Sequence, residues 1–222
     1  MTTKKYILTE ETIEFQGVTL HRIKALRNFS DIKAGTLGGW IEREDNLSHE
    51  NNAWVYGDAK VYGDAKVCDN AWVCDDAKVY GNVWVCDNAK VYGDAKVYGD
   101  AKVYGNAKVY GDAEVYGNAW VYGNAKVYDD AKVYGDAEVY GNAEVCGDAD
   151  YIVCKNWWSS GRYFTWTRSN NKWRVGCFYG TGDELIKKAY ADSDKSGREY
   201  ERVVRYVESI LEEENNESKT GK

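Results

Sequence analysis

Residues 89–100 read Ala89-Lys-Val-Tyr-Gly-Asp-Ala-Lys-Val-Tyr-Gly-Asp100, which is two copies of the six-residue pattern Ala-x-Val-Tyr-Gly-Asp/Asn. The pattern runs without insertion or gap from Ala53 to Asp148, over 96 residues or sixteen hexapeptides. Val occupies the third position of every copy, and the first position is Ala in every copy except the one that begins at Val83. A fixed short period over such a length predicts a solenoid of stacked turns.

The order of residues within the hexapeptide predicts one short strand and one corner. Side chains alternate along a strand, so Val is expected to face inward and its two neighbours outward. Gly followed by Asp or Asn tolerates positive φ and lets the chain turn. Each hexapeptide is therefore expected to form one flat side of the solenoid.

A second and longer period predicts that three hexapeptides complete one turn. The last hexapeptide position is Asp throughout one set of residues spaced by 18, here named the Asp column: Asp58, Asp76, Asp94, Asp112, Asp130 and Asp148. It is Asn throughout a second set, Asn70, Asn88, Asn106, Asn124 and Asn142, which Asn52 extends one step back before the first hexapeptide; these six residues are here named the Asn ladder. We expect about five turns, with a degenerate turn beginning near Leu47.

The string Val-Tyr-Gly-Asn-Ala-Lys resembles the signature of left-handed parallel β-helix proteins, in which a small residue follows an aliphatic one by four positions. The resemblance covers 96 of the 222 residues and implies a left-handed winding, since the period itself does not specify the hand. Many members of this superfamily are acyltransferases that use a histidine as general base and bind acyl-CoA between subunits. Carbonic anhydrases with a similar repeat use three histidines to hold zinc.

The flanks are expected to cap the solenoid, because stacked turns leave unpaired backbone at both ends. Residues 1–52 are expected to form a small β cap and residues 53–148 the β-helix. Residues 149–211 are expected to form an α+β module, with a hairpin around Ser169-Asn-Asn171 and two helices. Residues 212–222 are expected to be a disordered tail. The predicted fold is thus mainly β: a three-sided left-handed parallel β-helix with a β cap and a C-terminal α+β module.

Composition limits the classes of partner. The chain has 36 acidic and 29 basic residues, a net charge of −7, which disfavours nucleic acid and anionic membranes as partners. No stretch approaches the roughly 18 apolar residues of a membrane helix, and the N-terminus turns acidic where a signal peptide would be apolar. We therefore expect a cytoplasmic protein with free thiols, and no membrane contact.

Two histidines are available for the acyltransferase chemistry that the resemblance implies. His21 lies in a predicted strand, where a structural role is expected. His49 falls where later repeats place the inward Val, which favours a capping role. The uninterrupted repeat leaves no loop to carry a catalytic group, and two histidines do not suffice for the carbonic anhydrase site. His49 is kept as the catalytic candidate of the alternative function only.

The Asp column is the candidate metal site. Carboxylates stacked about 5 Å apart repel one another by about 1 kcal/mol in water, and Ca²⁺ prefers clustered carboxylate oxygens. Asp is, however, an ordinary corner residue, and a Lys follows two positions after four of the six. We expect no bound metal, and keep Asp58, Asp76, Asp94, Asp112 and Asp130 as the candidates if a cation binds.

Outward side chains supply the candidate binding residues. The tyrosine face is defined by Tyr62, Tyr80, Tyr98, Tyr116 and Tyr134, which recur once in every third hexapeptide and so fall on one side. Aromatic residues are enriched at interfaces, so this ladder could dock a partner as well as stabilise the strands. The C-terminal patch is the second candidate and comprises Trp157, Trp158, Arg162, Trp166, Arg168 and Arg174.

Cys68 and Cys86 are neighbours by the period of three hexapeptides. Because they replace Tyr at an outward position, we expect small packed surface residues rather than a disulfide. No Cys-x-x-Cys motif or Cys–His spacing indicates zinc.

These observations favour a non-catalytic scaffold without a cofactor that binds a protein partner or a second copy of itself. The first alternative is an acyltransferase that uses acyl-CoA, and the second is an acidic decoy of nucleic acid.

Overall fold

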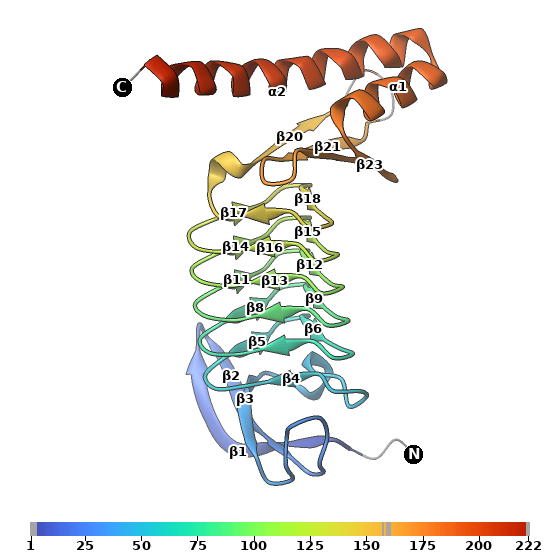
Figure 1. The fold of residues 1–222 in the computed structure, drawn as a ribbon. Helices are drawn as coiled ribbons and strands as arrows, with labels where there is room; N and C mark the ends of the chain where they lie inside the picture. Colours follow the sequence, from blue (N-terminus) through green and yellow to red (C-terminus); the bar gives the residue numbers. More distant parts are fainter. Residues whose placement is uncertain (1–3, 157, 159–160, 221–222) are drawn as a thin grey trace. The chain divides into compact units, whose positions relative to one another are not determined.

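The computed structural model describes residues 4–156, 158 and 161–220, and it is mainly β (Figure 1). The chain divides into two compact units, Met1–Val153 with Thr167–Asn170, and Cys154–Trp166 with Asn171–Lys222. The first contains the solenoid and the second contains both α-helices. No helix in the described part of the chain has the length and apolar character needed to cross a membrane.

The sixteen hexapeptides form sixteen short strands on three sides, as predicted. The strands are β4 (Trp54–Val55), β5 (Lys60–Tyr62), β6 (Lys66–Val67), β7 (Trp72–Val73), β8 (Lys78–Tyr80), β9 (Trp84–Val85), β10 (Lys90–Val91), β11 (Lys96–Val97), β12 (Lys102–Val103), β13 (Lys108–Val109), β14 (Glu114–Val115), β15 (Trp120–Val121), β16 (Lys126–Val127), β17 (Lys132–Val133), β18 (Glu138–Val139) and β19 (Glu144–Val145). They make three parallel stacks, β5-β8-β11-β14-β17, β6-β9-β12-β15-β18 and β4-β7-β10-β13-β16-β19. Paired residues are separated by three hexapeptides, as in Val97 with Val79 and Val115.

The interior of the solenoid is made of Val and Ala. Every Val at the third position and every residue at the first position of the repeat is at most 1% exposed. At the corners, residues such as Gly99 (φ 76°) adopt the left-handed conformation, which Asp75 (φ 61°) and Asp129 (φ 54°) also adopt where they replace Gly. The Asn ladder forms as expected, with side-chain hydrogen bonds of 2.9–3.3 Å from Asn52 through to Asn142.

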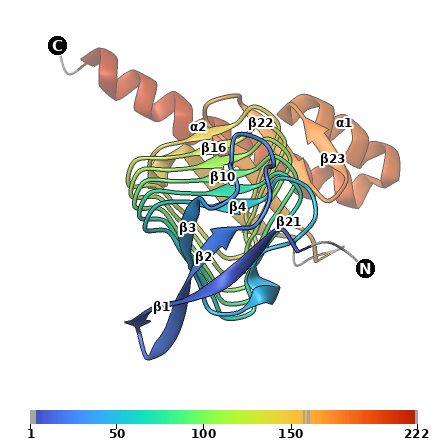
Figure 2. The ribbon, with the colours of Figure 1, turned by 90° about the horizontal axis from the view of Figure 1, so that it is seen from below.

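The N-terminal cap adds one turn to the five expected, giving about six. Strands β1 (Tyr6–Phe15), β2 (Val18–Ala25) and β3 (Leu37–Ile41) are antiparallel, and β3 also pairs in parallel with β5. A 3-10 helix, η1 (Glu44–Asn46), follows. In Figure 2 the turns of the solenoid lie over one another and the β1–β2 hairpin projects beside them.

Two glycines let β3 enter the stack. A Cβ at Gly38 would lie 2.6 Å from the Val55 carbonyl oxygen, and one at Gly39 would lie 2.7 Å from that of Ala59. Only glycine fits so close to a neighbouring backbone. The left-handed winding stays a prediction from the resemblance.

The C-terminal region contains 3-10 helix η2 (Asp148–Asp150), strands β20 (Tyr151–Lys155), β21 (Tyr163–Thr167), β22 (Lys172–Val175) and β23 (Phe178–Gly180), and helices α1 (Gly182–Asp192) and α2 (Asp194–Thr220). The predicted capping box opens α1, because Thr181 and Glu184 each bond the other's backbone N–H. The predicted hairpin is present, but its second arm breaks at Gly176 (φ 56°) into β22 and β23.

The tail expected to be disordered is helical as far as the chain is described, since α2 continues to Thr220. Four of the nine residues in the segment 212–220 are Glu, a good helix former, and the segment extends a helix already begun. High charge alone therefore did not indicate disorder here.

Candidate functional site

The tyrosine face is a continuous stack of five rings on the outer side of β5, β8, β11, β14 and β17. Successive ring centroids are 5.0, 5.1, 4.9 and 5.3 Å apart, and the rings are within 13° of parallel. The strand register produces this geometry, because each Tyr occupies the same outward position of the next turn. The other two sides have stacks of three tyrosines, Tyr92-Tyr110-Tyr128 and Tyr104-Tyr122-Tyr140.

The two ends of the tyrosine face differ. Tyr62 is 6% exposed, because Phe15 packs edge-on against its ring and Gln16 accepts a hydrogen bond from its hydroxyl at 3.0 Å. Tyr134 at the other end is 50% exposed. Burial raises the pKa of Tyr62 to about 12 and also raises the pKa of Tyr80. These phenols stay neutral at physiological pH, so the face presents uncharged rings.

An open groove of about 520 Å³ lies on the same side of the solenoid. Its lining residues are Lys78, Lys96, Lys132, Asp94, Asp112, Asp130 and Glu114. Lys96 donates to Glu114 at 2.9 Å, and the Tyr98 hydroxyl donates to the same carboxylate at 3.0 Å. The hydrogen bond from Lys96 lowers the pKa of Glu114 and in return raises that of Lys96. Charges of both signs suit a polypeptide, whereas a polyanion would meet four carboxylates against three ammonium groups.

The Asp column lies along one edge of this groove, with its side chains in solvent. Asp58, Asp76, Asp94, Asp112 and Asp130 are all exposed. At its start, Arg22 lies 3.5 Å from Asp58. Among the described residues, three possible metal-ligand atoms come within 4.8 Å of one another at Cys68, Asp69 and Cys86 rather than in the column. The column is therefore an exposed row of corner carboxylates.

The predicted register of His49 is wrong. Leu47, not His49, bridges to Val67 across the first turn. Asn52 and Asn70 keep the regular spacing of three hexapeptides. Leu47 and Val67 are two residues further apart in the sequence than that spacing. Two extra residues thus loop out between Leu47 and Asn52. Leu47 fills the interior at 1% exposure, and His49 lies in the loop.

The surroundings of His49 determine which nitrogen carries its proton. Its Nδ1 accepts a hydrogen bond from the Lys5 backbone N–H at 3.2 Å, which leaves the proton on Nε2. Nε2 is buried without a hydrogen-bond partner among the described residues, 3.9 Å from Glu44. The ring stacks on Tyr6 at 4.3 Å, and burial lowers the pKa of His49 against the opposing effect of Glu44. A general base needs a free lone pair, and here the one lone pair is occupied.

The residues of the C-terminal patch do not form one surface. Trp166 is 1% exposed, and its Nε1 donates to Asn171 at 2.9 Å. Arg168 belongs to the first unit, where its Nε donates to the Ala149 carbonyl at 3.1 Å. Arg162 is exposed, Trp158 and Arg174 are half-buried, and Trp157 lies outside the described residues. Alternation along β21 could not show this burial, because residues 164–167, on both sides of the strand, are all buried.

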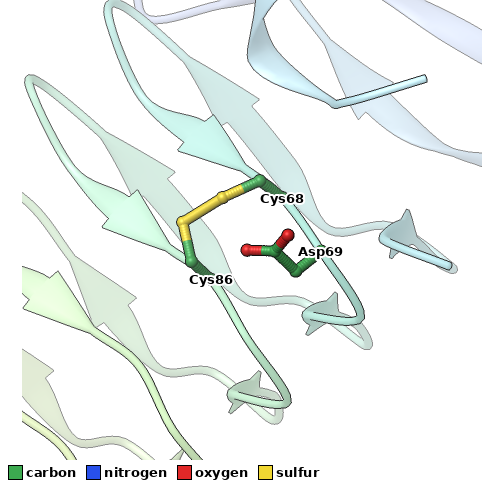
Figure 3. A group of neighbouring side chains, drawn as sticks. All are labelled: Cys68, Asp69 and Cys86. Atoms are coloured by element: carbon green, nitrogen blue, oxygen red, sulfur yellow. A yellow bond between two sulfur atoms is a disulfide. The ribbon is translucent and has the colours of Figure 1, made fainter. Parts of the chain in front are cut away.

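Cys68 and Cys86 form a disulfide, which corrects the expectation of two small surface residues (Figure 3). Their Cα atoms are 4.7 Å apart on neighbouring turns. Their separation by three hexapeptides was the signal for this contact. The remaining described thiols, Cys74, Cys146, Cys154 and Cys177, are free as expected.

Comparison with known proteins gives a limited match. No protein-family model matches the chain. One stretch of 61 residues is 43% identical to a protein of Escherichia coli (strain K12) named as the uncharacterized acetyltransferase YdcK. The match covers 24% of this chain and 19% of that protein, so the chain spans only a small part of its relative. Together with the β-solenoid, this similarity supports a hexapeptide-repeat-like superfamily.

Proposed function

We propose that the chain is a non-catalytic scaffold that binds a protein partner along the tyrosine face and the adjoining charged groove. The observation that carries this proposal is the five-ring stack, which becomes more accessible from Tyr62 towards Tyr134. Flat, neutral rings supply contact area at low entropic cost, and tyrosine is enriched among interface hot spots. The mixed charges beside them favour a polypeptide as the occupant.

A photo-crosslinking residue placed at Tyr134 and at the control position Tyr128 tests this proposal. Tyr128 is half-buried and ends the stack on another side of the solenoid. Crosslinking in the organism that encodes the chain is expected to yield a discrete protein adduct from position 134 and none from position 128. The adduct partner is then purified and its affinity measured.

Loss of a hot-spot ring typically costs about 2 kcal/mol or more, about thirtyfold in affinity. We expect Tyr116→Ala and Tyr134→Ala each to weaken binding of the purified partner by about that factor, and Tyr128→Ala to leave it unchanged. Equal effects of all three variants, or an adduct that forms equally from both positions, would contradict the proposal. If the crosslinked protein is a second copy of the chain, the tyrosine face mediates self-association and does not bind a different protein.

The similarity to a protein named as an acetyltransferase favours a second candidate, acyl transfer from acyl-CoA. In that case His49 would have to release its bond to Lys5 before acting as a base. Calorimetry with acetyl-CoA separates the two candidates. The scaffold predicts no heat of binding, whereas an affinity that disappears in His49→Ala would establish the enzyme.

A further inference from the structure

The disulfide lies beside a carboxylate that points toward it. Cys68 follows β6 and Cys86 follows β9, one turn further along. Asp69 turns the corner with φ 56°, and Figure 3 shows its carboxylate directed toward the space beside the two sulfurs. The two sulfurs and a carboxylate oxygen all lie within 4.8 Å of one another. Two thiolates and a carboxylate are a ligand set suited to a thiophilic divalent cation.

We propose that reduction of the Cys68–Cys86 disulfide creates a site for one thiophilic divalent cation, Zn²⁺ or Cd²⁺, with Asp69 as the third ligand. A dithiol reductant supplies two electrons and two protons, becomes a disulfide itself, and leaves two protein thiols. The cation then binds both sulfurs as thiolates and releases the two thiol protons. The three residues are half-buried, so a water molecule can occupy the fourth position of a tetrahedral site.

The solenoid has two further Cys-Asp pairs, Cys74-Asp75 and Cys86-Asp87. The first of them shows what distinguishes the position of Cys68. Cys74-Asp75 has the same local sequence, but Tyr56 and Tyr92 are its neighbours in the stack, so only one thiol is present. Its thiol also has a raised pKa, about 11, because of burial and the nearby Asp75. At this position the thiolate is disfavoured and has no second sulfur beside it.

The hydrogen bonds of the carboxylates separate Asp69 from the other two. Asp75 accepts from the Gly93 N–H at 3.1 Å, and Asp87 accepts from the Gly105 N–H at 2.9 Å, each toward the following turn. Asp69 makes longer contacts, 3.3 Å from the Asn51 side-chain amide and 3.4 Å from the Asp87 N–H. Asp69 is also the carboxylate that lies within 4.8 Å of both sulfurs.

The charge of a neighbouring side chain also favours metal binding at this site. Three anionic ligands around a divalent cation leave one excess negative charge. Lys66 lies on β6, the strand that Cys68 follows, and its ammonium is 5.6 Å from the ring centre of Trp84. A positive side chain two residues from Cys68 favours this anionic site.

Titration of the full chain with Cd²⁺ tests the proposal, using the thiolate-to-cadmium charge-transfer absorption and the bound-metal stoichiometry. A phosphine reduces the disulfide, taking up the oxygen of one water molecule, and contributes no competing thiol. The variants are Cys86→Tyr, which restores the Tyr found at this position in the next turns, and Asp69→Asn. Cys74→Ser is the matched control, and thermal melts confirm that each variant is folded.

We expect one Cd²⁺ per reduced chain in the unaltered protein and in Cys74→Ser, and none in the oxidised protein or in Cys86→Tyr. Changing a group that merely orients a ligand already weakens metal sites by about 10–100-fold, so loss of the Asp69 ligand itself is expected to weaken binding by about 100-fold. Binding that survives in the oxidised protein or in Cys86→Tyr would overturn the site. Unchanged affinity in Asp69→Asn would overturn the role of Asp69.

Discussion

The regular turns of the solenoid and its first turn fill their interiors with different residues. In the regular turns, identical Val and Ala side chains from three sides fill the interior. The first turn uses Ile41, Leu47 and Trp54, and brings in Lys5 as a fully buried side chain. A turn inside the repeat is thus stabilised by its neighbouring turns alone, whereas the turn at the end needs contacts from distant parts of the sequence.

The polar groups of the first turn illustrate the same difference. Lys5 Nζ donates to the Ala53 carbonyl at 2.7 Å and to that of Glu50 at 3.2 Å. Buried Asn46 donates to the carbonyls of Gly63 and Ala65 at 3.0 and 2.9 Å. In the regular turns, backbone groups of the next turn make such bonds. At the end, side chains replace the missing turn.

The largest expected effect is a charge placed inside a regular turn. Val103→Asp puts a carboxylate in an interior without polar partners. Full burial raises a carboxyl pKa by about 3–5 units, so the group takes up a proton near neutral pH at a cost of about 4 kcal/mol of stability. Urea unfolding should therefore show loss of the cooperative transition. Lys102→Asp, one residue away on the outer surface, is the control and should change the transition little. Similar stabilities for both variants would contradict the inward placement of Val.

The next effect concerns the buried lysine of the first turn and depends on pH. Burial, with a further contribution from Arg27, lowers the pKa of Lys5 to about 8. The unfolded chain keeps the ordinary value, so between pH 8 and 10.5 it binds more protons than the folded chain, and stability rises with pH. The shift corresponds to about 3 kcal/mol.

Urea unfolding across this pH range, compared with Lys5→Met, isolates that contribution from the tyrosines. The stability of the unaltered protein relative to Lys5→Met is expected to increase with pH. A difference that stays constant with pH would show that Lys5 is solvated.

A third test compares two glycines at equivalent corners. Gly99 and Gly135 both have positive φ, 76° and 66°. A Cβ at Gly99 would lie 3.0 Å from the Gly117 nitrogen, whereas one at Gly135 would meet nothing within 4 Å. Gly135→Ala should cost about 1 kcal/mol for the backbone conformation alone, and Gly99→Ala about 2–3 kcal/mol because the contact adds to it. Equal costs in thermal unfolding would show that the turns are not stacked this closely.

The smallest effect is expected on the Asn ladder. Asn106 accepts from Asn88 at 3.2 Å and donates to Asn124 at 3.0 Å. These bonds are exposed to water, so Asn106→Ala should cost about 0.5–1 kcal/mol in urea unfolding. Asn118→Ala, at a corner with one such bond to Asp136, should cost less. A loss of several kcal/mol at Asn106 would indicate that the ladder, rather than the Val and Ala interior, stabilises the solenoid.

The sequence predicted the part of the fold that depends on period. The inward Val, the corners, the columns of the stacked turns and the capping box of α1 follow from local pattern. The register of His49 did not, because a two-residue loop between Leu47 and Asn52 has no periodic signal. The burial of Lys5 could not be predicted either, since it depends on carbonyl groups 45–48 residues away.

The candidate site was predictable to a similar extent. The tyrosine face follows directly from the columns, and the structure adds the cover over Tyr62 and the groove. The C-terminal patch assumed that mixed aromatic and basic residues share a surface, whereas Trp166 is in the core. Cys68 and Cys86 were recognised as neighbours, but Tyr at the equivalent positions suggested packing rather than bonding. The spacing of residues in the repeat predicts which side chains are neighbours, but it does not predict whether a bond forms between them.

Disulfide trapping of engineered cysteines tests most directly the claim that residues three hexapeptides apart form columns, on which both the tyrosine face and the proposed metal site depend. In a chain with its native cysteines replaced by Ser, Asp94→Cys is combined with Asp112→Cys or with Asn106→Cys. Stacked residues lie about 4.8 Å apart, so the 94/112 pair is predicted to crosslink readily under mild oxidation and the 94/106 pair to remain reduced. Crosslinking of 94/106 in preference to 94/112 would contradict three hexapeptides per turn.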